Sequence, residues 1–343
     1  FAPYLSLYKI YVHKKRNIMR VTNRNASTSN APVCIRSRSL ISACFTPCID
    51  FDITPEMEEE NVVKFKEVHD DPADENEVVL VGEERHFEEA IEVEGCKQIL
   101  AALTEEEKGH LSDAHMTLRY FRAEKGNIPH AISKIKASLA WRRDFEVEKI
   151  KNCFTPSGDI TMRKIIAQEN ETGKIYARGY DRDGRAILYL HPGLENSNNE
   201  MNNMRHLVYS LERAIATTAK KSGKEKFNIV ISYKGFKLKN APAISVVRHT
   251  VDILQNHYPE RMYRAYVCDP PLVFRTFWSI VKPFIDPVTR DKLQFCHGKA
   301  GRHVLMERFD LETTERCACG TRELRAFNST EYLNAPLWKT FDE

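Results

Sequence analysis

The sequence lacks any apolar run of about eighteen residues, and this excludes a membrane-spanning helix with fair assurance. The nine cysteines follow no repeated spacing, and their odd number argues against a disulfide framework. Cys317 and Cys319 are one residue apart, which is too close for the usual paired zinc knuckle. We therefore expect reduced thiols in a non-secreted compartment, and no bound metal.

Signatures of common enzymes are also missing. The sequence has no Gly-x-Ser-x-Gly, no phosphate loop ending in Gly-Lys-Ser/Thr and no His-Glu-x-x-His. One partial match remains, because Cys296 and Arg302 have the Cys-x5-Arg spacing of tyrosine-phosphatase loops. Phe295 stands where those enzymes carry His, and His303 stands where they carry Ser or Thr. We expect no catalytic residue and no cofactor, with a phosphatase kept as a remote alternative.

Acidic residues are absent from residues 1–49, which contain eight Lys or Arg and many hydroxyl side chains. This composition resembles a plastid or mitochondrial presequence, and a disordered basic tail is the alternative. Residues 50–95 carry eighteen acidic residues against three basic ones, as expected for a disordered acidic linker.

The remainder, 96–343, has a net charge of about +10. A basic surface suits transient contact with an anionic membrane, to which each Lys or Arg contributes about 1 kcal/mol. The charge also suits nucleic acid, but no RNP, helix-turn-helix or zinc-finger motif supports that partner. We therefore expect a cytoplasmic, peripheral membrane protein that acts as a monomer without nucleic acid.

Hydrophobic periodicity predicts an α/β fold. Residues 97–122 are predicted to form two helices, and Asn127 with Pro129 begins another, so the chain starts with a small helical module. After it the strands and helices alternate, which implies parallel crossovers and a mostly parallel sheet layered with helices. The predicted strands are 186–190, 227–231, 264–268 and 293–296, and the predicted helices are 203–221, 243–256 and 272–285.

The segment from His257 to Asp286 is the most informative. Pro259 ends a helix, a short strand follows, and Pro270 and Pro271 stop that strand. The helix 272–285 then carries one wide apolar stripe, formed by Phe274, Phe277, Trp278, Val281, Phe284 and Ile285. By spacing alone this stripe fits an ordinary core helix as well as the wall of a site for an apolar ligand.

Several ordered motifs resemble the CRAL-TRIO family, which includes the yeast Sec14 phospholipid transfer protein and the tocopherol and retinaldehyde carriers. They are 118–123, Trp141-Arg142-Arg143, 181–190, Gln255-Asn256-His257-Tyr258-Pro259-Glu260-Arg261-Met262 and 282–289. The resemblance covers nearly all of 115–312. It implies a helical module at 96–150, a lipid-binding domain at 155–312 and a C-terminal tail, 313–343, that packs on that domain.

The family's fold encloses an apolar cavity, and the resemblance makes 272–285 its gate helix, which opens on a membrane to exchange lipid. Tyr189, Phe227, Ile229 and Ile231 are then expected to form the cavity floor beneath that helix. In the phosphatidylinositol-binding members an Arg-Lys pair, a Glu and a Lys read the headgroup. Lys125 and Lys282 fit the two lysines, whereas Glu124 and His249 replace the Arg and the Glu. Phosphoinositide specificity is therefore in doubt. One interpretation pairs Glu124 with His249 or Arg248, and the alternative is that Glu124, Lys125 and His249 are ordinary surface charges.

The resulting hypothesis is non-catalytic binding and intermembrane transfer or presentation of one lipid, a phospholipid or an isoprenoid. The alternative is a protein-interaction module of the same family that exchanges no lipid.

Overall fold

The computed structural model describes residues 79–343, apart from 82–83, 238–241 and 322. The presequence-like segment 1–49 and most of the acidic segment 50–95 lie outside the described residues. One boundary needs correction, because α2 begins at Glu89, so residues 89–95 are helical and not part of a disordered linker. Glu89 and Glu92 lie in the first turn, where carboxylates interact favourably with the helix dipole, and Ile99 is fully buried.

The N-terminal part of the described chain is a helical module. Thr104 begins α3 with a capping box completed by Glu107, and Asn127 caps α5 with Pro129 in its first turn, as predicted. Residues 97–122 hold parts of three helices where two were predicted. The helices before the sheet are α2 (Glu89–Ala101), α3 (Glu105–Gly109), α4 (Met116–Ala123), α5 (Ile128–Asp144), α6 (Val147–Lys151) and α7 (Ile160–Asn170), and β1 (Val79–Val81) pairs with β2 (Glu84–His86) before them.

The main sheet has five strands in sequential order. Its strands are β3 (Ile175–Tyr180), β4 (Ala186–Leu190), β5 (Phe227–Ser232), β6 (Met262–Cys268) and β7 (Leu293–Cys296). β3 pairs with β4 in an antiparallel manner, and the other neighbours are parallel. The four predicted strands and the mostly parallel α/β class are confirmed, whereas β3 was not predicted.

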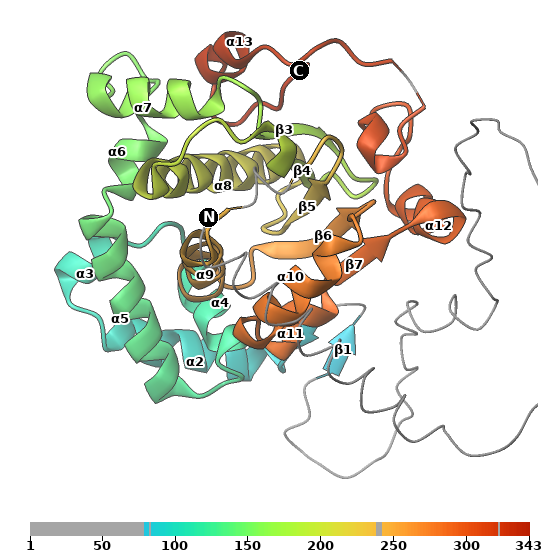
Figure 1. Cartoon of the computed structure of the whole chain (residues 1–343). Helices are drawn as coiled ribbons and strands as arrows, with labels where there is room; N and C mark the ends of the chain where they lie inside the picture. Colours follow the sequence, from blue (N-terminus) through green and yellow to red (C-terminus); the bar gives the residue numbers. More distant parts are fainter. Residues whose placement is uncertain (1–78, 82–83, 238–241, 322) are drawn as a thin grey trace, which may run out of the picture. The chain divides into compact units, whose positions relative to one another are not determined.

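The connections between the parallel strands place their helices on one face of the sheet. Strand order follows chain order, so successive right-handed crossovers must return over the same face. In Figure 1, α8 and α9 lie beside the strands and α10 lies next to β6 and β7. These connecting elements are α8 (Glu200–Ser222), α9 (Ile244–Asp252), a π-helical turn (Ile253–His257), α10 (Val273–Val281), the 3-10 turn Lys282–Phe284 and α11 (Pro287–Asp291).

The predicted helix 272–285 is shorter than expected. α10 ends at Val281 and the chain tightens into a 3-10 turn, because Pro283 has no N–H to donate to the helical ladder. None of the described helices is both long and apolar enough to cross a bilayer.

The opposite face of the sheet is covered by the C-terminal part of the chain. It contains α12 (Gly298–Arg308), a 3-10 turn (Arg316–Ala318) and α13 (Ser329–Asn334). The tail then follows the free edge of β3, where the N–H of Phe341 donates to the carbonyl of Ala177 at 2.9 Å. The buried Arg178 guanidinium contacts Asp342 and also Glu315, at 2.6 Å. The tail therefore closes an edge that would otherwise expose unpaired backbone groups.

Candidate functional site

Strand register divides the side chains of the sheet between two faces. Leu188 pairs with Ile229, and Ile229 pairs with Ala265, so these three side chains point the same way. Register assigns further residues to the same face of the sheet, which we call the inner face. Its residues are Leu188, Leu190, Phe227, Ile229, Ile231, Ala265, Val267, Leu293 and Phe295. Every residue in this set is apolar.

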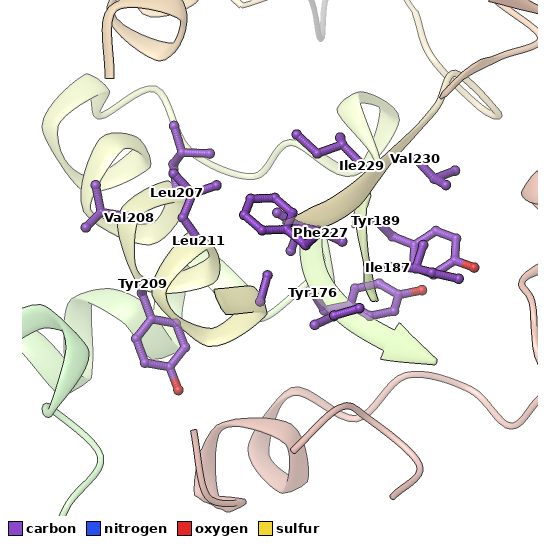
Figure 2. Close-up of a cluster of buried hydrophobic side chains, with 14 of the residues drawn as sticks. Tyr176, Ile187, Tyr189, Leu207, Val208, Tyr209, Leu211, Phe227, Ile229 and Val230 are labelled. Atoms are coloured by element: carbon purple, nitrogen blue, oxygen red, sulfur yellow. The ribbon is translucent and has the colours of Figure 1, made fainter. Parts of the chain in front are cut away.

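Helix α8 packs on one end of the inner face. Figure 2 shows Phe227 beside Leu207 and Leu211 of α8, and all three side chains belong to one buried core. Phe227 is fully buried and Ile229 is 4% exposed, whereas Ile231 is only partly buried. Three of the predicted cavity residues, Phe227, Ile229 and Ile231, therefore lie on the same face of β5 and point toward the crossover helices.

The prediction for Tyr189 was wrong. Tyr189 pairs with Val230 and Tyr176, which places it on the opposite face, as Figure 2 also shows. Its hydroxyl accepts a hydrogen bond from the N–H of Glu315 at 3.1 Å, so it holds the C-terminal segment. Full burial raises the pKa of this phenol well above its ordinary value. Tyr189 is thus a packing residue on the face away from α8.

The aromatic helix α10 covers the other end of the inner face. The Phe274 ring lies 5.9 Å from the Phe295 ring of β7, and the Trp278 ring lies 5.2 Å from Phe295 in an edge-on arrangement. Phe274 also meets Tyr233, just after β5, at 5.0 Å. Phe277 is partly buried beside Phe274. The predicted apolar stripe of α10 therefore contacts the sheet and the residue after β5 through aromatic rings.

Several apolar side chains are exposed on and beside the same helix, together with the polar Ser279. Leu272 is 83% exposed, and Val273, Ile280 and Phe284 are each close to 40% exposed. Val281 is buried, and Ile285 is partly buried just beyond the helix. A surface helix of a globular protein normally directs polar side chains to solvent, so this group of exposed apolar side chains indicates an apolar contact.

The predicted headgroup residues do not form the expected pair. Lys125 and Lys282 are exposed, and within the described chain neither one takes part in an ion pair. The Glu124 carboxylate lies 3.9 Å from His130, and the His249 ring lies 2.5 Å from Glu200 of α8. The expected pairing of Glu124 with His249 or Arg248 is therefore wrong.

Sequence reasoning missed one cation near the end of the aromatic helix. The guanidinium of Arg248, on α9, lies 4.4 Å from the centroid of the Phe284 ring. Phe284 belongs to the same 3-10 turn as Lys282. The sequence position of Arg248 could have indicated this role, because Arg248 precedes His249 on the helix before the Tyr-Pro-Glu-Arg motif.

The segment 257–262, which contains the Tyr-Pro-Glu-Arg motif, connects the helical module to the sheet domain. Arg261 lies 2.5 Å from the Asp113 carboxylate, and Arg119 lies 2.6 Å from Asp113 and 2.5 Å from Glu225. Burial would raise the pKa of Asp113, but hydrogen bonding and charge from Arg119 and the charge of Arg261 hold it well below its usual value. A pocket of about 270 Å³ lies among these groups. Asp113, Arg119, Glu225 and Arg261 are paired with one another, so they form a seam between two parts of the fold.

A second, more deeply buried cluster lies in the same seam. Arg142 of α5 donates to Glu212 of α8 at 2.9 Å, and the Tyr258 hydroxyl donates to the same carboxylate oxygen at 2.8 Å. Both charged side chains are 6% exposed. Tyr258 and Arg261 therefore attach the helical module to the sheet domain. The sequence motif alone did not reveal this structural role.

The thiol of the phosphatase alternative is not built into a phosphate loop. Cys296 is buried, and Arg302 lies on the exposed side of α12, whose first residue is Gly298. Residues 298–302 are therefore helical and do not wrap around the thiol. Cys296 instead pairs in register with Cys268, beside Cys317 and Cys319. Within the described ranges no group of three or more His, Cys, Asp or Glu is arranged to hold a metal ion.

Comparison with known proteins gives a consistent family. Residues 170–316 match the family model of the CRAL/TRIO domain. A CRAL-TRIO domain-containing protein of Schizosaccharomyces pombe is 39% identical over 178 residues, which are 52% of this chain and 16% of that protein. The phosphatidylinositol transfer protein PDR17 of Saccharomyces cerevisiae is 34% identical over 183 residues, 52% of this chain and 51% of that protein. The alignment therefore spans about half or less of these two curated relatives.

The SEC14 cytosolic factor of Kluyveromyces lactis is 25% identical over 260 residues, which are 72% of this chain and 83% of that protein. The crystal structure of Sfh5 superposes with a TM-score of 0.46 at 16% identity, covering 61% of this chain and 81% of that one. Over residues 170–316 the chain is therefore similar to the CRAL/TRIO domain, and over the aligned residues it is similar to these CRAL-TRIO and SEC14 proteins.

Proposed function

We propose that this chain binds one lipid between the inner face and the crossover helices, and carries or presents it between membranes without catalysis. The observation that carries the proposal is an apolar sheet face covered by a helix that packs aromatic rings on it and also exposes Leu272, Val273 and Ile280. A ligand that buries hydrocarbon there gains about 0.8 kcal/mol for each shielded methylene group, so no polar anchor is required inside.

In this proposal α10 is the gate. Phe274 and Trp278 rest on Phe295 when the site is closed, and the exposed Leu272 and Ile280 enter the membrane when the helix moves outward. Partial burial of Phe277 suits a side chain that must exchange a sheet contact for a lipid contact. The curated relative PDR17, which is named as a phosphatidylinositol transfer protein, supports lipid transfer as the function.

Cations near the gate provide the polar end of the proposed site. Lys282 follows α10 directly, and Arg248 lies against Phe284 in the same turn. A phosphate at the mouth would meet these two groups, with Lys125 as a further candidate. Because His249 is paired with Glu200, we assign it no contact with the ligand.

The test compares two aspartate substitutions on α10. Phe277→Asp puts a carboxylate on the side that faces the sheet, whereas Ile280→Asp puts one on the outer side. The full chain and both variants are passed over mixed liposomes, and the retained lipid is extracted and identified by mass spectrometry. Transfer of a fluorescent phospholipid between donor and acceptor vesicles is measured in parallel.

Wild type and Ile280→Asp should retain lipid in a one-to-one ratio, and Phe277→Asp should not. Ile280→Asp should slow transfer, because its defect lies in membrane contact. Circular dichroism confirms that both variants are folded. Retention by Phe277→Asp would refute the gate assignment, and a wild-type chain that emerges empty from every lipid mixture would favour the protein-interaction alternative.

A further inference from the structure

A second exposed surface combines lysines with an aromatic ring, and it lies outside the proposed lipid site. The Trp338 ring of the C-terminal tail is 43% exposed. The Lys220 and Lys339 ammonium groups each lie 5.5 Å from its centroid, and Lys221 lies 4.8 Å from the Tyr180 ring. We call Lys220, Lys221, Trp338 and Lys339 the tail patch.

The tail patch is fixed by contacts with the body of the domain. The Thr217 hydroxyl donates to the carbonyl of Leu337 at 3.4 Å, and Arg213 donates to the carbonyl of Lys339 at 3.0 Å. These bonds hold the indole against the C-terminal turn of α8. Trp338 is therefore presented on a rigid element, and its exposure is a property of the fold.

The lysines of the tail patch are not neutralised locally. Within the described chain, Lys220, Lys221 and Lys339 form no ion pair, and the nearby carboxylate of Glu343 accepts hydrogen bonds from Tyr180 and Thr340. Favourable charge from Lys221 adds to those bonds, and together they lower the pKa of Glu343 against the opposing effect of burial. Glu343 is therefore already hydrogen-bonded, and Lys221 is the one lysine of the tail patch whose charge acts on it.

We propose that the tail patch is a contact surface for an anionic phospholipid bilayer, separate from the gate helix. Lysines flanking a half-exposed tryptophan suit the headgroup region, where the ammonium groups meet lipid phosphates and the indole sits among the headgroups. Single-stranded nucleic acid is less well matched, because successive bases need successive aromatic platforms and this surface offers one well-exposed ring. The contact would hold the protein on a membrane while the gate is closed.

The first test measures sedimentation of the full chain with vesicles of phosphatidylcholine and with vesicles containing phosphatidylserine. Each lysine neutralised should weaken binding about fivefold, so Lys220→Gln/Lys221→Gln should weaken binding to the anionic vesicles about 25-fold. Lys97→Gln/Lys299→Gln is the matched control, because it removes the same charge from exposed lysines of α2 and α12. This control should weaken binding by no more than about threefold.

The second test places a reporter at the patch itself. The chain has three tryptophans, so Trp141→Phe/Trp278→Phe leaves Trp338 as the only indole. Brominated phosphatidylserine vesicles should quench its fluorescence, and added salt should reverse the quenching.

Equal losses in both lysine pairs, or absence of quenching at Trp338, would overturn the proposal. It would also be overturned if the patch variant lost affinity for single-stranded RNA or an acidic peptide while keeping its affinity for vesicles. None of these readouts depends on bound cargo or on transfer. Failure of the gate proposal and failure of this one can therefore be told apart.

Discussion

Removal of the Glu212 carboxylate should destabilise the seam between the helical module and the sheet domain. Glu212 accepts hydrogen bonds from Arg142 and Tyr258, and both charged side chains are 6% exposed. Burial lowers the pKa of Arg142, but the charge of Glu212 more than compensates and raises it above its ordinary value. Glu212→Gln therefore leaves a buried guanidinium without its main counter-charge.

The expected loss follows from the partners that remain. Removing one member of a buried ion pair costs about 3 to 5 kcal/mol. Arg142 keeps a 3.0 Å contact with Glu148, but that side chain is 61% exposed, so it recovers only part of the loss. We expect Glu212→Gln to lower the free energy of unfolding by about 3 kcal/mol, or the melting temperature by roughly 6 to 10 °C.

Urea denaturation followed by circular dichroism and by tryptophan fluorescence measures this loss. Trp141 stacks on His257 with ring centroids 4.0 Å apart, so its emission reports on the seam. The Arg142→Leu/Glu212→Leu double variant should be more stable than either single variant, because it leaves no unpaired buried charge. Strictly additive losses, or a loss below about 1 kcal/mol for Glu212→Gln, would refute this account of the seam.

Two further predictions concern pH and the C-terminal tail. Burial lowers the pKa of His257 from 6.5 to about 4, so the unfolded chain takes up a proton first and stability should fall between pH 6.5 and 4. His257→Phe should flatten that part of the curve in urea titrations at several pH values, and an unchanged slope would contradict the assignment. Arg178→Met should cost about 2 to 3 kcal/mol and speed proteolysis of the tail, because it leaves Asp342 without its buried partner. Thermal melts measure this loss. In them Arg316→Met, which breaks the exposed 3.8 Å pair with Glu323, should cost less than about 0.5 kcal/mol.

The alternation of the elements and their approximate ranges could be predicted from sequence, because each parallel strand is a short apolar run bounded by turns. The sequence could not predict which face of the sheet each side chain occupies. Ala186 to Leu190 is apolar at every position, so periodicity gives no sign of which residues point toward α8. Tyr189 was misplaced for this reason, and only its pairing with Val230 decides the face.

Long-range contacts set the other limit. The spacing of the aromatic helix predicted its stripe, but not that Phe295, from a different strand, would be its main partner. Likewise, no local signal indicates that Arg261 meets Asp113, a residue 148 positions earlier. Glu124 lies 3.9 Å from His130, six residues away in the same module, and not beside a residue of α9.

The tail beside β3 also decides where the folded domain ends. The family match stops at residue 316, yet Phe341 pairs with the edge of β3 and Asp342 contacts the buried Arg178. A chain shortened to the matched residues would leave a bare strand edge and would remove Asp342, one of the two carboxylates that contact Arg178. The bare edge favours aggregation through edge-to-edge pairing. Insolubility of such a fragment would therefore report the missing cover, and would say nothing about whether the domain needs a lipid to fold.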